Sequence, residues 1–157
     1  MKTKALIITI LVMFSAMAAQ AQENMFDKFS GNKEITTVVI SKALLSMVPN
    51  MDAGGVDIKS LASKLDKLEI YTSENKSAIK AMKSEADKLA KNKSYEVLMS
   101  MKEKDQNVNF YAQQAGNNKF KELVMYVSEE ENCTIIRIVG NFTMEDLQNL
   151  VKDADKK

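Results

Sequence analysis

The sequence predicts one α+β domain over residues 22–157, an antiparallel sheet whose final four strands form a meander, with helices packed mainly on one face. Two observations carry this prediction. Apolar residues recur at helical spacing before Asn92, whereas after it they alternate with polar residues, as in strands. The alternating segments are separated by polar turns of a few residues, and such short connections join antiparallel neighbours because a parallel crossover needs a longer chain.

The N-terminal segment has the layout of a cleaved secretory signal. Lys2 and Lys4 precede the apolar run 5–14, and the small residues Ala19 and Ala21 suit a signal peptidase. This run of ten residues is short, because crossing a bilayer takes about 20 apolar residues. We therefore expect cleavage after Ala21 and a periplasmic or secreted protein. No cysteine stands at the cleavage site, so neither a lipid-modified N-terminus nor a stable membrane anchor is expected.

The first elements of the domain are a helical turn, a strand and a helix. Met25, Phe26 and Phe29 lie on one side of the turn and are expected to dock on the core, with an exposed amphipathic foot as the alternative. The β-branched run 35–40 predicts a buried strand. Ser41 is placed to cap the helix that follows.

Two further helices are predicted before the meander. Asp57 is placed to cap the first, whose apolar residues repeat at helical spacing: Ile58, Leu61, Leu65 and Leu68. This helix leads into an alternating strand over residues 68–72. The longest helix is predicted from Ser73 to about Lys91, with one apolar stripe opposite a solvated face of mixed charge.

The meander and a final helix complete the domain. Its strands are predicted over residues 95–101, 108–112, 120–127 and 134–139. Thr143 can cap the amide of Asp146 at the start of the last helix, and Phe142 and Leu147 have the spacing of a hydrophobic staple.

Composition excludes several classes of function. The chain has no histidine and one cysteine, Cys133, which rules out imidazole-based catalysis, histidine-ligated metals and an internal disulfide. Cys133 is expected to be a buried or half-buried strand residue. Cleavage would leave 20 basic and 21 acidic residues, a net charge of −1, with Arg137 as the single arginine. Nucleic-acid binding is therefore not expected.

Three segments offer reactive residue types without the rest of a known site. The glutamates at 129–131 carry concentrated charge, but calcium loops alternate their oxygen ligands around a glycine. Asp52 with the glycines at 54–55 lacks the spacing and lysine of a phosphate-binding loop. Ser60 and Lys64 lack the S-x-x-K spacing, and Lys64 would need burial to act as a base. We therefore assign no catalytic, cofactor-binding or metal-ligating residue.

Three residue types remain as candidate binding surfaces. The lysines of the long helix are expected to be solvated, because acids are interspersed among them. The four tyrosines, at 71, 95, 111 and 126, are expected to be strand side chains rather than a stacking platform. Eight methionines remain after residue 21. Most are expected in the core, and the others suit an adaptable apolar groove between sheet and helices.

Several blocks along the domain carry a family resemblance: Phe26-Asp27-Lys28-Phe29, Val38-Val39-Ile40-Ser41-Lys42-Ala43-Leu44, Leu68-Glu69-Ile70, Tyr95-Glu96-Val97-Leu98, Lys121-Glu122-Leu123-Val124-Met125 and Val139-Gly140-Asn141-Phe142. In these blocks the chain resembles DUF4252, a domain of unknown function found in exported proteins of Bacteroidetes. The resemblance implies an envelope location and supplies neither an activity nor functional residues. Many family members look like lipoproteins with a cysteine at the cleavage site, and this chain departs from that pattern.

These observations favour a non-catalytic interaction or ligand-binding protein of the cell envelope, without a cofactor. Its partner is expected to be an envelope protein or a small apolar ligand, contacted through an open sheet face or strand edge. One alternative is a carboxylate-dependent hydrolase acting on glycans, which needs two acids about 5 to 10 Å apart in a cleft. Another is a structural protein that joins its partner through a sheet edge.

Overall fold

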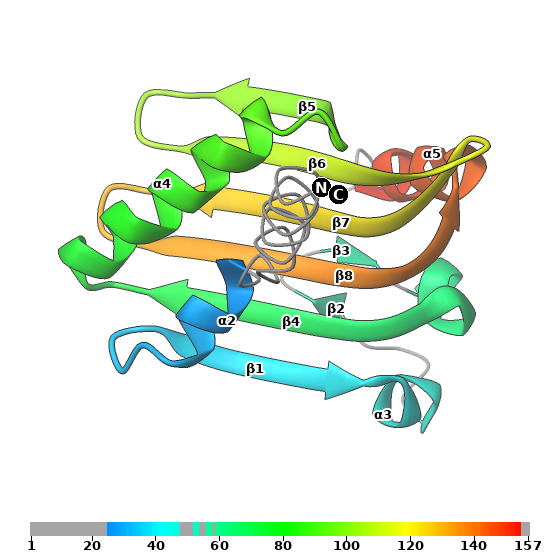
Figure 1. Cartoon of the computed structure of the whole chain (residues 1–157), viewed down its shortest axis with the longest axis horizontal. Helices are drawn as coiled ribbons and strands as arrows, with labels where there is room; N and C mark the ends of the chain where they lie inside the picture. The colour runs from blue at the N-terminus through cyan, green and yellow to red at the C-terminus, as the bar shows by residue number, and fades with distance from the viewer. Residues whose placement is uncertain (1–24, 48–51, 54–55, 58, 155–157) are drawn as a thin grey trace, which may run out of the picture.

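The computed structural model describes residues 25–47, 52–53, 56–57 and 59–154, so the predicted signal segment lies outside the described residues. Six of the described strands form one antiparallel sheet in the order β1-β4-β8-β7-β6-β5 (Figure 1). Their bounds are Thr36–Ser41 for β1, Leu65–Ser73 for β4, Tyr95–Lys102 for β5, Asn107–Gly116 for β6, Lys119–Ser128 for β7 and Cys133–Thr143 for β8. A separate hairpin pairs β2 (Asp52–Ala53) with β3 (Val56–Asp57).

The predicted α+β class and meander are confirmed. Strands β5 to β8 are consecutive neighbours, and each pair is antiparallel. Asn117 and Asn118 connect β6 to β7 with φ angles of 52° and 56°. Two residues with positive φ match the twist of the strands that they join, which is why asparagine is favoured there.

The helices are divided between the two faces of the sheet rather than packed mainly on one. Their bounds are Met25–Ser30 for α2, Lys42–Met47 for α3, Lys59–Lys64 for the 3-10 helix η2, Lys76–Lys91 for α4 and Met144–Ala154 for α5. Helices α2 and α4 pack on one face, hereafter the α4 face, and α3 and α5 pack on the other, the α5 face. The central strands carry buried apolar residues on both faces, so both faces need a cover. No helix within the described ranges is long and apolar enough to cross a membrane.

Strand register separates two hydrophobic cores, because residues opposite each other point to the same face. Tyr71, Ile135 and Tyr126 lie in register on the α4 face and belong to the core beneath α2 and α4. Leu68 and Ile138 lie in register on the α5 face and belong to a second core with α3 and α5. Phe26 and Phe29 are buried in the first core, which confirms that α2 docks.

The strand predicted over residues 35–40 is real but was wrongly expected to be buried. It forms β1, at one edge of the sheet, where only β4 pairs with it. Val38 and Val39 are 45% and 57% exposed. β-Branched composition marks a strand, but it does not distinguish an edge strand from a central one.

The helix predicted from Asp57 was also wrong. Asp57 ends β3, and the helical part is limited to η2. Leu65 and Leu68 are fully buried in strand β4, where a bulge between Leu65 and Lys67 shifts the register. The bulge brings two leucines that are three residues apart into the same core, so that they imitate helical spacing.

The starts of the two long helices are set by side-chain caps. Helix α4 begins at Lys76, a few residues after the predicted start near Ser73, and Asn75 caps it, because its side chain accepts hydrogen bonds from the amides of Ser77 and Ala78. At α5, Thr143 Oγ1 accepts from the Asp146 amide at 3.3 Å, and Asp146 Oδ2 accepts from the Thr143 amide at 2.7 Å. This reciprocal pair confirms the predicted cap.

Candidate functional site

A buried ion cluster crosses the α4 face of the sheet. Glu69 on β4, Arg137 on β8 and Glu122 on β7 come from three adjacent strands. Arg137 Nη1 donates to Glu69 Oε2 at 2.8 Å, and Arg137 Nη2 donates to Glu122 Oε2 at 2.7 Å. None of the three was predicted from the sequence as a site residue. The sequence signal that could have indicated them is a charged residue within an apolar strand, at a position that shares a face with buried neighbours.

Each remaining carboxylate oxygen of the cluster has its own partner. Lys67 Nζ lies 2.7 Å from Glu69 Oε1, and Tyr95 Oη donates to Glu122 Oε1 at 2.6 Å. The Arg137 guanidinium also lies 4.4 Å above the ring centroid of Phe26, a cation–π contact that connects the cluster to α2.

Burial and ion pairing oppose each other in this cluster. Burial raises the pKa of Glu69, but hydrogen bonds from Lys67 and Arg137 outweigh burial and hold the pKa below its usual value. Burial lowers the pKa of Arg137, and its hydrogen bonds to Glu122 and Glu69 reverse that effect, so that the pKa is raised. The pKa of Tyr95 is raised by burial and by its hydrogen bond to Glu122.

This arrangement opposes acid–base catalysis. A glycoside hydrolase needs a carboxylic acid whose pKa is raised, so that it can donate a proton. Glu69 has a lowered pKa, and all four carboxylate oxygens of Glu69 and Glu122 are engaged. A groove of about 590 Å³ runs beside the cluster, lined by α2, α4 and the sheet, with Lys28, Glu85 and Lys88 at its rim. The groove therefore offers mixed charge but no free general acid.

The opposite face of the sheet carries an uninterrupted apolar row. One residue from each strand lies in register across the sheet: Val38, Ile70, Ile136, Met125, Phe110 and Met99. We call these six residues the apolar row. Val38 and Met99 end it with large exposed side chains, and Met101 is exposed beside Met99 in the same face of β5.

The methionines are more exposed than predicted, since most of them were expected in the core. Met82 is fully buried in the core beneath α4. Four others are exposed: Met47, Met99, Met101 and Met144. Met25 and Met125 are half-buried against the two cores. Most described methionines therefore form surface rather than core, where their flexible side chains can adapt to a partner.

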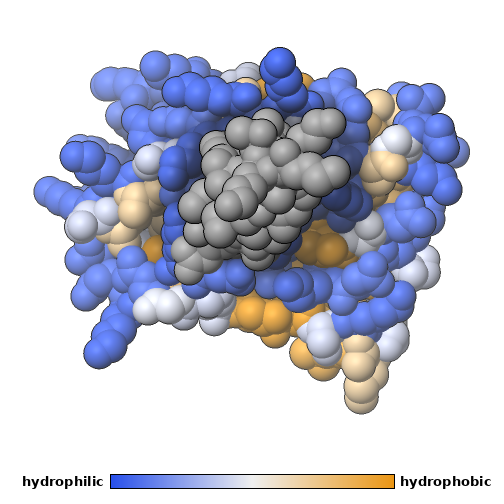
Figure 2. Space-filling model, viewed as in Figure 1, coloured by the Kyte–Doolittle hydropathy of each residue, from blue (hydrophilic) through white to orange (hydrophobic). Residues whose placement is uncertain are grey.

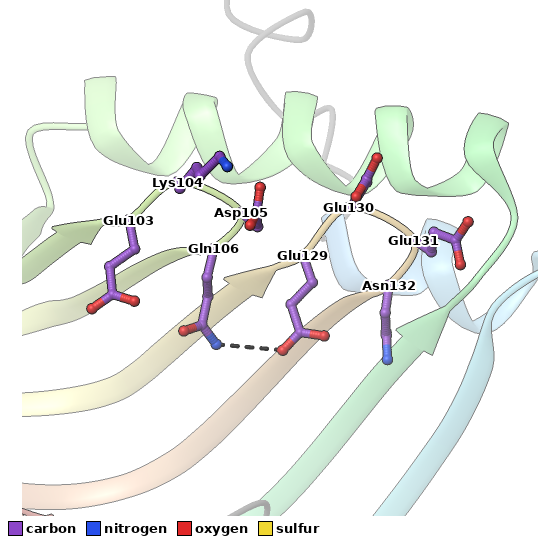
Figure 3. Close-up of a pocket in the computed structure, with 8 residues that line it drawn as sticks. All are labelled: Glu103, Lys104, Asp105, Gln106, Glu129, Glu130, Glu131 and Asn132. Carbon is purple, nitrogen blue, oxygen red and sulfur yellow. Dashed lines mark hydrogen bonds between the residues drawn. The ribbon is translucent and has the colours of Figure 1, made fainter.

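The acidic turn predicted at 129–131 lies beside a second polar turn. Residues 103–106 and 129–132 line a hollow of about 470 Å³ (Figure 3). Glu129 points toward Gln106, whose Nε2 donates to it at 3.4 Å, whereas Glu130 and Glu131 point elsewhere. The carboxylates do not converge. In the described part of the chain, no three or more histidine, cysteine, aspartate or glutamate side chains are placed to hold a metal ion.

The remaining sequence candidates do not assemble into a site. Lys64 is exposed and pairs with Asp146 at 2.6 Å, and the Ser60 side chain and the glycines at 54–55 fall outside the described residues. Lys88 pairs with Glu85 on the solvated face of α4. Cys133 is buried, as expected, and burial raises the pKa of its thiol to about 11.

The tyrosines are strand side chains, as expected. Tyr71, Tyr111 and Tyr126 are buried on the α4 face, and Tyr95 is half-buried. Tyr71 stacks against Phe26 at a centroid distance of 5.7 Å. They therefore serve the core rather than an exposed stacking surface.

The comparisons agree with the resemblance found in the sequence blocks. Comparison with curated proteins finds no match. The model of the family "Domain of unknown function (DUF4252)" matches residues 29–150, which include all six strands of the large sheet and most of the described helices. The chain belongs to the DUF4252 family.

Proposed function

We propose that this protein is an exported, non-catalytic interaction protein of the cell envelope, and that Met99 and Met101, on the α5 face of β5, form the surface that contacts a partner protein. The observation that carries the proposal is the exposure of two neighbouring large apolar side chains on one face of β5, Met99 at 43% and Met101 at 39%. Contiguous exposed apolar surface on a small protein is typical of interaction sites.

Shape favours a protein partner over a small apolar ligand. Small ligands are usually held in concave, largely apolar pockets. The two hollows described above are lined mainly by charged and polar residues, and neither includes Val38, Met99 or Met101. Two neighbouring exposed methionines at a sheet edge suit an apolar surface on another protein.

Export is supported by the signal-like layout of residues 1–21. An interaction role is further supported by the state of the buried acids. Glu69 and Glu122 are fully engaged with Arg137, Lys67 and Tyr95, so neither carboxyl group of this buried pair is free to donate a proton to a substrate.

Site-specific photo-cross-linking in the producing cell tests this proposal. A photoreactive residue at Met99 or Met101 should give an adduct of one defined mass, because both side chains lie on the α5 face of β5. The matched control is Val97, which lies on the same strand, is also exposed and points to the α4 face. The protein should be recovered from the periplasm with Gln22 as its first residue.

The partner protein identified from the adduct, once purified, should raise the Tm of the wild type but not that of Met99→Lys. A partner that binds only the folded form stabilises that form. Equal adducts from Val97, or no adduct from either methionine, would contradict the proposal. So would release of reducing ends from envelope glycans by the purified protein.

A further inference from the structure

Strand β1 is an edge strand without the usual protection against pairing. Its six residues, Thr36–Ser41, include no charge and no proline, and the register with β4 shows no bulge. The opposite edge differs, because β5 is interrupted by a bulge between Val97 and Met99 and ends on Lys102. Natural edge strands commonly avoid mispairing through charges, prolines and bulges. Among the described strands at the two edges, β1 is therefore the open one.

We propose that a second copy of this chain pairs with β1, antiparallel and about a two-fold axis perpendicular to the sheet, so that two six-stranded sheets become continuous. Val38 of one copy would face Val38 of the other. This contact is distinct from the partner surface at Met99 and Met101, because it uses backbone hydrogen bonds along β1, at the opposite edge of the sheet.

The register follows from the alternation of side chains. Opposed residues in an antiparallel pair share a face, so a symmetric pair must be centred on one residue rather than between two. Centring on Val38 places Thr36 opposite Ile40 and Thr37 opposite Val39, so these residues of β1 pair only with each other and no like charges are opposed. Centring on Val39 would place Thr36 opposite Lys42, the first residue of α3, and centring on Thr37 would place Ile40 opposite Glu34, which lies in a turn. Strand geometry therefore favours the register centred on Val38.

Exposed side chains support the same edge. Hydrophobic side chains gather along the lower border of the space-filling view, over β1 (Figure 2). Val38 is 45% exposed on the α5 face and Val39 is 57% exposed on the α4 face, so pairing would cover apolar area on both sides. Six residues of edge pairing make a small interface, and we expect dissociation constants in the micromolar to millimolar range.

Sedimentation equilibrium of the purified protein from about 1 μM to about 1 mM tests the inference. The wild type should show a monomer–dimer equilibrium. Val39→Lys should raise the dimer Kd by about tenfold or more, because it brings two ammonium groups together near the two-fold axis. Val97→Lys is the matched control, on the same face and 49% exposed, but at the other edge. It should leave the Kd unchanged.

The inference fails if the wild type remains monomeric up to the highest concentration, or if Val97→Lys weakens the dimer as much as Val39→Lys. Cross-linking from Met99 and Met101 has a separate readout, so failure of either proposal leaves the other standing.

Discussion

At the residue scale, Arg137 organises the polar part of an otherwise apolar interior. It is the single arginine of the chain, and its two carboxylate partners lie 68 and 15 residues away in sequence. The sequence contains the charges but not the register that brings them together, so the cluster was not predicted. Burial of Cys133, Phe26 and Phe29 was predicted, because burial of apolar side chains follows from their type and local pattern.

Arg137→Met tests whether the ion cluster is structural. Removing the guanidinium leaves two carboxylates buried without their shared partner, and we expect the free energy of unfolding to fall by about 3 to 5 kcal/mol. Urea unfolding followed by circular dichroism measures it. Lys67→Met is the control, because its partly exposed ion pair with Glu69 should contribute about 1 kcal/mol or less.

Combining Arg137→Met with Glu69→Leu and Glu122→Leu should recover most of the lost stability, because no buried charge then remains. Lys67 loses its partner Glu69, but the lysine side chain is 41% exposed and stays solvated. An Arg137→Met protein as stable as the wild type would show that the cluster does not stabilise the fold.

At the element scale, signals that act within three or four residues predicted structure well, and signals that depend on distant pairing did not. The start of α5 was predicted because Thr143 and Asp146 are three residues apart. The helix expected around Leu65 and Leu68 was wrong because both residues pair with β8, which lies more than 60 residues further along the chain. A ladder of backbone hydrogen bonds to distant strands outweighs a weak local helical pattern.

Thr143→Ala tests the local cap. Loss of the hydroxyl leaves the Asp146 amide without its acceptor, and we expect about 1 kcal/mol of destabilisation. Thr143→Ser is the conservative control, because serine keeps the capping oxygen and should lie within a few tenths of a kcal/mol of the wild type. Thermal unfolding of the three proteins provides the comparison. If alanine and serine behave alike, the hydroxyl contributes nothing to the cap.

At the scale of the whole molecule, one continuous sheet separates two cores that are covered by different helices. The order of strands in the meander could be predicted from the sequence, because short connections leave little choice of neighbouring strand. The positions of β1 and β4 in the sheet could not be predicted, because β4 pairs with β8 across a long stretch of chain that includes α4. The apolar row follows from this order, since only the complete register aligns its six residues.

Each core is bordered by a carboxylate whose pKa is lowered. Acidification should therefore reduce the stability of the packing on both faces of the sheet together. Glu69 lies on the α4 face, and Asp146 lies in the first turn of α5, the helix that packs on the α5 face. Burial raises the pKa of Asp146, but hydrogen bonds from Lys64 and Thr143 outweigh burial and lower it below its usual value of 3.8. The ordinary value for Glu69 is 4.5, and its pKa is likewise lowered.

A group whose pKa is lower in the folded state binds fewer protons there than in the unfolded state, so it stabilises the fold above its unfolded pKa. This stabilisation should be complete at neutral pH and fall progressively as the pH drops below about 4.5 and then below 3.8. Urea midpoints followed by circular dichroism between pH 7 and pH 3 measure the loss. Asp146→Asn should be less stable than the wild type at neutral pH and should lose less on acidification, because one titrating group is gone. Parallel pH profiles for the two proteins would contradict the assignment of this acid sensitivity to the α5 cap.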